Sequence, residues 1–384
     1  MRLWKRVSGV LKDQNSLWIS SLSRRTSLRN PDIESAIIKA TSHDELSVDY
    51  KNAERVYRWI RLSDSHVKPI IWCLSLRMEK TSNWAVALKG LMLMHGVFTS
   101  KVPVVQRIGR LPFDLSNFKD GHCKPGEIWA HNAFIRSYYT FLDHKSTLLF
   151  MNMQEKRGLK GIQDQNNNRP LMQDLVVLQK LQGLLDLLMQ IKPLSRSAAR
   201  VFLVVEAMEC VLIEVFDIYS RICHMITVVL KRIDLAGKAE AALAVRVLKK
   251  AIIQGDDLSL YFELCRQIGV ANASGCPKIV EVPQDDIYEL ELMISEITDT
   301  SKELQEANKA IVKVSQQPQT NDHQEVDDSK CRLRTVITDN WEKFDDDLMI
   351  VSIETSKYNP FLSSPTPPRQ QTKCDDLPDL ISFL

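Results

Sequence analysis

Apolar side chains recur at steps of three and four residues from residue 31 to about residue 268, and almost no stretch alternates apolar with polar positions. This spacing places apolar residues on one face of an α-helix, whereas a β-strand needs a period of two. The clearest series ends before Pro193 and consists of Leu171, Leu175, Leu178, Leu181, Leu185 and Leu188. The pattern predicts an all-α fold, a superhelical stack (solenoid) or bundle of helices.

Capping residues predict where two of these helices begin. Asn30 can cap a helix that starts at Pro31, because Pro fits the first helical position and Asn accepts a free backbone N–H. Thr81 or Ser82 is expected to start a second helix that ends before Gly96.

Composition divides the rest of the chain. Residues 197–230 are apolar nearly all round and predict a central helix, and two shorter helices are expected over 236–254 and 258–268. Turn-forming residues between 157 and 169 indicate an internal linker. The expected regions are a basic amphipathic leader (1–30), a helical domain (31–280, with subdomains at about 31–156 and 170–280), an acidic helix or linker (281–315) and a disordered tail with peptide motifs (316–384).

Charge is distributed unevenly, although the net charge is only +2. Residues 1–30 hold seven Lys/Arg and one acid, whereas residues 281–350 hold 18 Asp/Glu and seven Lys/Arg. A basic leader suits an anionic surface such as a membrane or nucleic acid. A nucleic-acid binder would need basic residues to continue along a helix with aromatic residues for stacking, and the acidic distal region argues against it.

Motifs for catalysis, cofactors and metals are absent from the sequence. The eight cysteines lie far apart, which indicates reduced thiols and a cytoplasmic protein rather than a disulfide framework or a zinc site. His43, Asp44 and Glu45 are interpreted as a solvated loop, and His95 and His131 as packing residues. We therefore expect no enzyme, no cofactor and no bilayer-spanning segment.

Four separated motifs occur in one order along the chain: residues 37–44 (IIKATSHD), 83–89 (NWAVALK), 115–118 (LSNF) and 134–136 (FIR). Together they resemble the ANTH domain of clathrin assembly proteins of the plant type, over roughly residues 1–280. The resemblance implies a helical superhelix that binds phosphatidylinositol 4,5-bisphosphate, nucleates clathrin coats and can recognise small R-SNARE cargo. It also implies a peripheral membrane protein of clathrin-coated pits and vesicles or of the Golgi.

The family's inositide site is a lysine followed, after nine residues, by a basic cluster that ends in His or Tyr. Lys39 matches the first lysine and Lys51 falls within the cluster. Asp49 stands where a lysine is expected, and Asn52 stands in place of the final His or Tyr. Each Lys or Arg near an anionic surface contributes about 1 kcal/mol, so the change to Asp weakens this site.

The leader offers a replacement for the lost charge. Leu3, Val7, Val10, Leu11 and Trp18 can share one helical face, flanked by Lys5, Arg6 and Lys12, with Trp4 near the membrane interface. This arrangement is typical of a helix that lies on a membrane. The alternative is that Trp4, Val7 and Leu11 pack on the domain and the basic residues form a solvated rim.

Ser27 lies in a basic context, Arg24 to Arg29, that resembles the target of a basophilic kinase. A phosphate there would reduce the positive charge of the leader and could release a membrane.

The tail carries three peptide motifs. Asn359, Pro360 and Phe361 form an NPF turn that resembles the ligand of EH domains. Trp341 and Phe344, followed by three aspartates, resemble peptides that bind adaptor appendage domains. The alternative for these two aromatics is a small helix, with Leu348, that packs back on the domain.

The last residues, Leu380, Ile381 and Phe383, look like a clathrin box for the clathrin heavy chain, with the terminal carboxylate in place of the usual acid. The sequence as a whole predicts an endocytic clathrin adaptor. The alternative is a helical trafficking scaffold that recognises SNARE cargo without binding clathrin directly.

Overall fold

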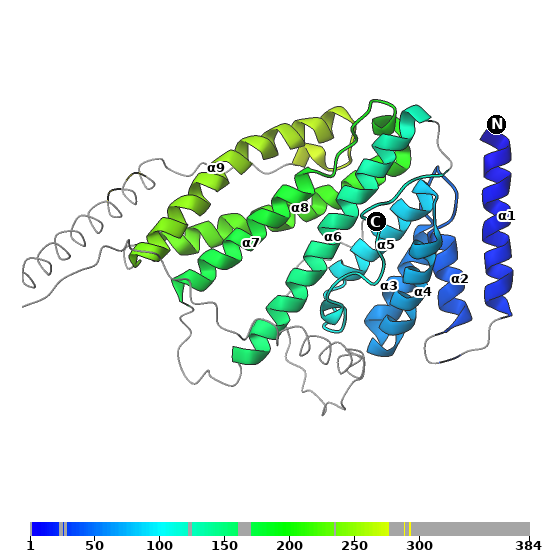
Figure 1. Ribbon diagram of the computed structural model, residues 1–384, viewed down its shortest axis with the longest axis horizontal. Helices are drawn as coiled ribbons and strands as arrows, with labels where there is room; N and C mark the ends of the chain where they lie inside the picture. The colour runs from blue at the N-terminus through cyan, green and yellow to red at the C-terminus, as the bar shows by residue number, and fades with distance from the viewer. Residues whose placement is uncertain are drawn as a thin grey trace, which may run out of the picture. The chain divides into compact units, whose positions relative to one another are not determined.

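The computed structural model describes residues 2–22, 26, 29–121, 125–159, 170–233, 236–275, 288 and 292, without the side chains of 2–6, 125–127 and 156–159. Its α-helices are α1 (Arg2–Ser21), α2 (Pro31–Ala40), α3 (Tyr50–Leu62), α4 (Val67–Lys80), α5 (Trp84–Thr99), α6 (Pro125–Leu159), α7 (Leu171–Met189), α8 (Phe202–Leu230) and α9 (Lys238–Gln267) (Figure 1). The described residues contain no strand. The all-α prediction is therefore confirmed.

Helix α2 begins where the sequence predicts. The side chain of Asn30 accepts a hydrogen bond from the backbone N–H of Asp32 (3.0 Å), and Pro31 occupies the first helical position. Asp32 and Glu34 add negative charge to the first turn, where the helix dipole favours it.

Helix α5 begins later than predicted, and the predicted end before Gly96 is wrong because the helix continues to Thr99. Its cap is Asn83, whose Oδ1 accepts from the backbone N–H of Ala85 (3.0 Å) and of Val86 (3.2 Å). The predicted start at Thr81 or Ser82 is wrong because Asn83 satisfies two of the otherwise unbonded donors of the first turn. Residues 84–95, at the centre of the fold, are all buried.

Helix α7 lies beside α8 and α9 (Figure 1). All six leucines of the predicted series are buried, and the helix ends at Met189, before Pro193. The prediction for this helix is confirmed. Helix α8 begins at Phe202 rather than at residue 197, because the chain first forms a short 3-10 turn, Ala198–Arg200.

Helix α9 corrects the prediction of two helices between residues 236 and 268. It is continuous through Gly255, which is buried. Beside this glycine, the amide of Gln254 donates to the backbone carbonyl of Gln182 on α7 (2.8 Å). Packing against α7 offsets the cost of about 1 kcal/mol that a glycine imposes inside a helix.

The chain divides into two units, and all of these helices belong to the first. None of the helices in the described ranges has the length and apolarity that a bilayer crossing requires. Most of the acidic region 281–315 and all of the tail 316–384 lie outside the described residues. The division into subdomains 31–156 and 170–280 stays a prediction.

Candidate membrane-binding surface

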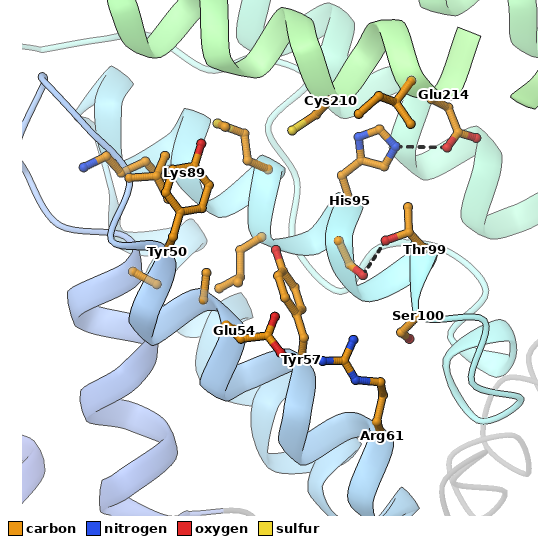
Figure 2. A pocket seen from close by; sticks show the side chains of 17 residues that line it. Tyr50, Glu54, Tyr57, Arg61, Lys89, His95, Thr99, Ser100, Cys210 and Glu214 are labelled. Carbon is orange, nitrogen blue, oxygen red and sulfur yellow. Dashed lines mark hydrogen bonds and ion pairs between the residues drawn. The ribbon is translucent and has the colours of Figure 1, made fainter. Parts of the chain in front are cut away.

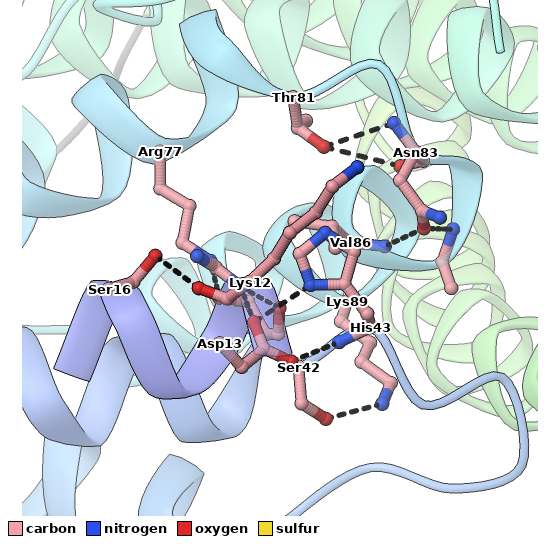
Figure 3. A network of polar contacts seen from close by, with 12 residues as sticks. Lys12, Asp13, Ser16, Ser42, His43, Arg77, Thr81, Asn83, Val86 and Lys89 are labelled. Atoms are coloured by element: carbon pink, nitrogen blue, oxygen red, sulfur yellow. Dashed lines mark hydrogen bonds and ion pairs between the residues drawn. The ribbon is translucent and has the colours of Figure 1, made fainter. Parts of the chain in front are cut away.

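A network around Asp13 joins α1 to the rest of the helical unit (Figure 3). One carboxylate oxygen of Asp13 lies 2.8 Å from Nδ1 of His43, and the other accepts from the backbone N–H of His43 (2.8 Å). Arg77 of α4 donates to the same carboxylate (2.9 Å) and to the backbone carbonyl of Thr41 (2.7 Å). Helix α1 is therefore held to the loop after α2 and to α4 by one partly buried carboxylate.

The charge of Asp13 is stabilised where it lies. Burial raises the pKa of this carboxyl group, but the hydrogen bonds from His43 and Arg77 outweigh burial and leave the pKa below its ordinary value. His43 was expected in a solvated loop, and that prediction is wrong because its ring and its backbone both contact Asp13.

Gly9 lets α1 approach this closely. A Cβ atom at this position would lie 2.7 Å from Cβ of His43, which is shorter than the distance at which two non-bonded carbon atoms can approach. Ser20, on the same side of α1, is also buried. The inward face of the helix therefore includes the small or polar residues Gly9, Asp13 and Ser20 beside Leu17.

The outward face of α1 is apolar and open to solvent. The highest exposures are those of Val7, Val10, Leu11 and Trp18 on the helix and of Leu22 directly after it, from 52% for Val7 to 65% for Leu22. We call these five residues the outer face of α1. The alternative in which Val7 and Leu11 pack on the domain is wrong, and the side chains of Trp4, Lys5 and Arg6 lie outside the described residues.

The lysines of the expected inositide site do not converge. Lys39, Lys51 and Lys12 are all exposed. Lys39 lines a shallow pocket whose charged residues are otherwise acidic: Asp13, Asp44 and Asp49. Lys51 does not line this pocket. Three carboxylates around one lysine disfavour an anionic headgroup.

The two residues that depart from the family cluster have a structural role at the start of α3. Asp49 caps this helix, since its Oδ1 accepts from the backbone N–H of Asn52 (3.1 Å). Its Oδ2 accepts from the side-chain amide of Asn52 (2.7 Å). Asp49 and Asn52 are therefore hydrogen-bonded to each other at the start of α3.

Sequence reasoning missed a basic face further along α3, formed by Lys51, Arg55 and Arg58. The signal was available, because these residues follow one another at steps of four and three.

A mostly apolar cavity of about 130 Å³ lies between α3, α5 and α8. Figure 2 shows Tyr57 and Arg61 reaching it from α3, His95 from α5 and Cys210 from α8. Burial raises the pKa of the Cys210 thiol to about 12, so this thiol is held in its unreactive neutral form.

His95 is a packing residue, as the sequence predicts. Its ring nitrogens lie 2.8 Å from the hydroxyl of Tyr138 and 3.2 Å from the carboxylate of Glu214. Glu214 also pairs with Lys145 (2.7 Å). Burial lowers the pKa of His95. His131 likewise packs, stacked on Trp84 with ring centroids 4.4 Å apart.

The remaining candidate residues lie outside the described residues and stay predictions. They are Ser27 in the leader, and in the tail Trp341, Phe344, Asn359, Pro360, Phe361, Leu380, Ile381 and Phe383.

Comparisons with known proteins match most of the chain. The model of the ANTH domain family matches residues 32–296. A protein of Arabidopsis thaliana named as a clathrin assembly protein is 45% identical over 399 residues, covering 100% of both chains. A second Arabidopsis protein with this name is 43% identical over 353 residues, covering 90% of this chain and 89% of its own.

One solved structure is also similar, the ENTH domain of epsin-2 in complex with phosphatidylinositol 4,5-bisphosphate. It shares 19% identity at a TM-score of 0.45, covering 65% of this chain and 96% of its own. A likeness of this degree supports no inference about the present chain.

Proposed function

The chain belongs to the ANTH domain family and, within it, to the clathrin assembly proteins, and on that premise we propose that it is a non-enzymatic adaptor between an anionic membrane and a clathrin coat. It would act in the cytoplasm, peripherally on membranes, at clathrin-coated pits and vesicles or at the Golgi.

The observation that carries the membrane half of the proposal is the two-sided character of α1. Its inward face is fixed by Gly9 and Asp13, and its outer face is apolar with no partner among the described residues. Fully burying one large apolar side chain contributes about 1.5–3 kcal/mol. The outer face therefore gives the leader enough apolar surface to enter the headgroup region of a bilayer.

Basic side chains would add electrostatic attraction. Lys12 and Lys39 are exposed, and the leader contains Lys5 and Arg6. We assign less of the affinity to the pocket around Lys39, because Asp13, Asp44 and Asp49 surround it. An inositide such as phosphatidylinositol 4,5-bisphosphate would be bound mainly as one source of negative charge.

Recruitment would depend on the tail. The NPF turn at residues 359–361 would bind EH domains. The aromatic pair Trp341 and Phe344 would bind an adaptor appendage domain, and residues 380–383 would bind the clathrin heavy chain. Each motif is short, and together they would raise avidity through effective concentration. R-SNARE cargo would be recognised by the helical domain.

Vesicle flotation of the full chain tests the membrane half. We expect binding to vesicles that contain phosphatidylserine or phosphatidylinositol 4,5-bisphosphate, and about tenfold or greater loss in Leu11→Ser/Trp18→Ser, because two apolar side chains are removed from the interface. The matched control is Leu260→Ser, since Leu260 is 71% exposed on α9. Equal binding by the leader variant and the control would contradict the assignment to α1.

A second arm replaces the lysine that lines the pocket by Lys39→Glu. If binding depends on the inositide and this variant loses more affinity than the leader variant, the inositide pocket, rather than α1, is the main site.

Pull-downs with the isolated tail test recruitment. Deletion of residues 359–361 is expected to remove EH-domain binding and leave clathrin binding intact. Deletion of residues 379–384 is expected to remove clathrin binding and leave EH-domain binding intact. If clathrin binds neither the full tail nor the full chain, the protein is a trafficking scaffold without direct clathrin contact.

A further inference from the structure

Helix α3 presents a row of cations on its outward face. Lys51, Arg55 and Arg58 follow one another at one-turn spacing, and over seven residues an α-helix rises about 10 Å. The opposite side of α3 is buried through Ala53, Val56 and Ile60. We call Lys51, Arg55 and Arg58 the basic stripe.

Arg55 is held in position within this stripe. Its Nη1 donates to Oδ1 of Asn52 (3.1 Å), and its guanidinium lies over the ring of Trp59, 5.2 Å from the centroid. Asn52 is itself held by Asp49 (2.7 Å). The side chains of Asp49 and Asn52 thus orient an arginine one turn further along the helix.

Acidic partners are missing from the stripe. Among the described residues, no ion pair is formed by Lys51, Arg55 or Arg58. Arg61, on a neighbouring side of the same helix, is neutralised by Glu54. The three positive charges of the stripe therefore remain available to a ligand, whereas Lys39 faces three carboxylates.

Apolar side chains accompany these cations. Leu62 lies in line with the stripe and is 69% exposed, and Trp59 is partly exposed beside it. Tryptophan prefers the level of lipid headgroups, and arginine binds phosphate through two parallel hydrogen bonds. A nucleic acid would complement the cations but would leave Leu62 in water.

We propose that the basic stripe, with Trp59 and Leu62, binds the phosphate groups of anionic phospholipids and is the main headgroup contact of the helical domain. This inference deepens the proposed membrane function and rests on it. The headgroup contact is thereby placed on the surface of α3 rather than in the acidic pocket beside Lys39.

Flotation of the full chain with phosphatidylserine vesicles tests the proposal, with Arg55→Gln/Arg58→Gln as the variant. We expect about 30-fold weaker binding, since each cation contributes roughly fivefold. The control is Arg196→Gln/Arg246→Gln, which removes the same charge from two exposed arginines elsewhere. It should change binding less than twofold.

A single substitution keeps the test independent of folding. Arg58 is exposed and forms no hydrogen bond or ion pair with the residues that the structure describes, so Arg58→Glu should retain the thermal midpoint of the wild type and still weaken vesicle binding by more than tenfold. Wild-type-like binding by both stripe variants overturns the inference and leaves the proposed function standing. Absence of vesicle binding by the wild type overturns both.

A peptide of residues 281–350 distinguishes the lipid from an internal acidic partner. If the stripe variants bind vesicles normally but no longer bind this peptide, the stripe contacts the chain's own acidic region and the lipid assignment is overturned.

Discussion

Asp13 links the leader to the domain at the scale of a single residue. The contact spans 30 positions to His43 and 64 to Arg77. No local pattern predicts such a contact, and the sequence only marked Asp13 as the single acid in a basic leader. Its carboxylate and the missing side chain of Gly9 decide which face of α1 points outward.

Replacing Asp13 by Asn should open α1. The loss of charge-assisted bonds to His43 and Arg77 is expected to lower the free energy of opening by about 1.5–3 kcal/mol. Hydrogen exchange of the amides of α1 measures this directly. Asp44→Asn is the control, because the hydrogen bonds of Asp44 go to Leu46 and Ser47 in its own turn and not to α1. Unchanged protection in Asp13→Asn would contradict the role of this carboxylate.

The docking of α1 should also depend on acid pH. The pKa of Asp13 is below its ordinary value of 3.8 when α1 is docked. The ionised carboxylate of Asp13 therefore stabilises the docked state fully at pH values above 3.8. This stabilisation is lost as the pH falls through the lowered pKa of Asp13. Exchange of α1 amides should accelerate on acidification in the wild type, after correction for intrinsic rates, and much less in Asp13→Asn.

Glu214 holds together the polar network in the core. Glu214→Gln would leave Lys145 without its carboxylate partner and weaken the contact with His95. Breaking such a buried pair costs about 3–5 kcal/mol, so the thermal midpoint should fall by several degrees. Glu263→Gln, which breaks an exposed pair with Arg266, should leave the midpoint unchanged. An unchanged thermal midpoint in Glu214→Gln would show that this network contributes little to the stability of the fold.

At the scale of helices, predictions held where one local signal dominated. The leucines of α7 and the Asn30–Pro31 start of α2 were recognised from sequence because capping and periodicity act within a few residues. The break predicted near Gly255 failed because contacts between α9 and α7 outweigh a local cost. The candidate site was only partly predictable. Lys39, Lys51 and Asp49 were recognised from the sequence, but only the fold brings Asp13 of α1 and Asp44 of the loop after α2 to the pocket that Lys39 lines.

The start of α5 offers a test of capping. Asn83→Ala should destabilise the fold by about 1 kcal/mol, because the backbone N–H groups of Ala85 and Val86 lose their acceptor. Chemical denaturation measures the difference. Asn117→Ala, at an exposed position outside any helix, should have a smaller effect. Equal effects would argue that Asn83 is not the functional cap.

At the scale of the whole molecule, charge and hydrophobicity separate two tasks. The leader and the basic stripe concentrate cations and exposed apolar side chains, whereas residues 281–350 are strongly acidic. Negative charge in this region would keep it away from an anionic bilayer. In the proposed adaptor, the N-terminal helices meet the membrane and the tail meets the coat.

Fluorine NMR on vesicle-bound protein tests the central claim, that the outer face of α1 enters the membrane. The seven tryptophans would be replaced by 5-fluorotryptophan, with Trp18→Phe and Trp84→Phe assigning two signals. Trp18 is 64% exposed and Trp84 is 3% exposed. Nitroxide-labelled lipid in phosphatidylserine vesicles should broaden the Trp18 signal and leave that of Trp84 sharp. A Trp18 signal that stays sharp while the protein is bound would contradict the account.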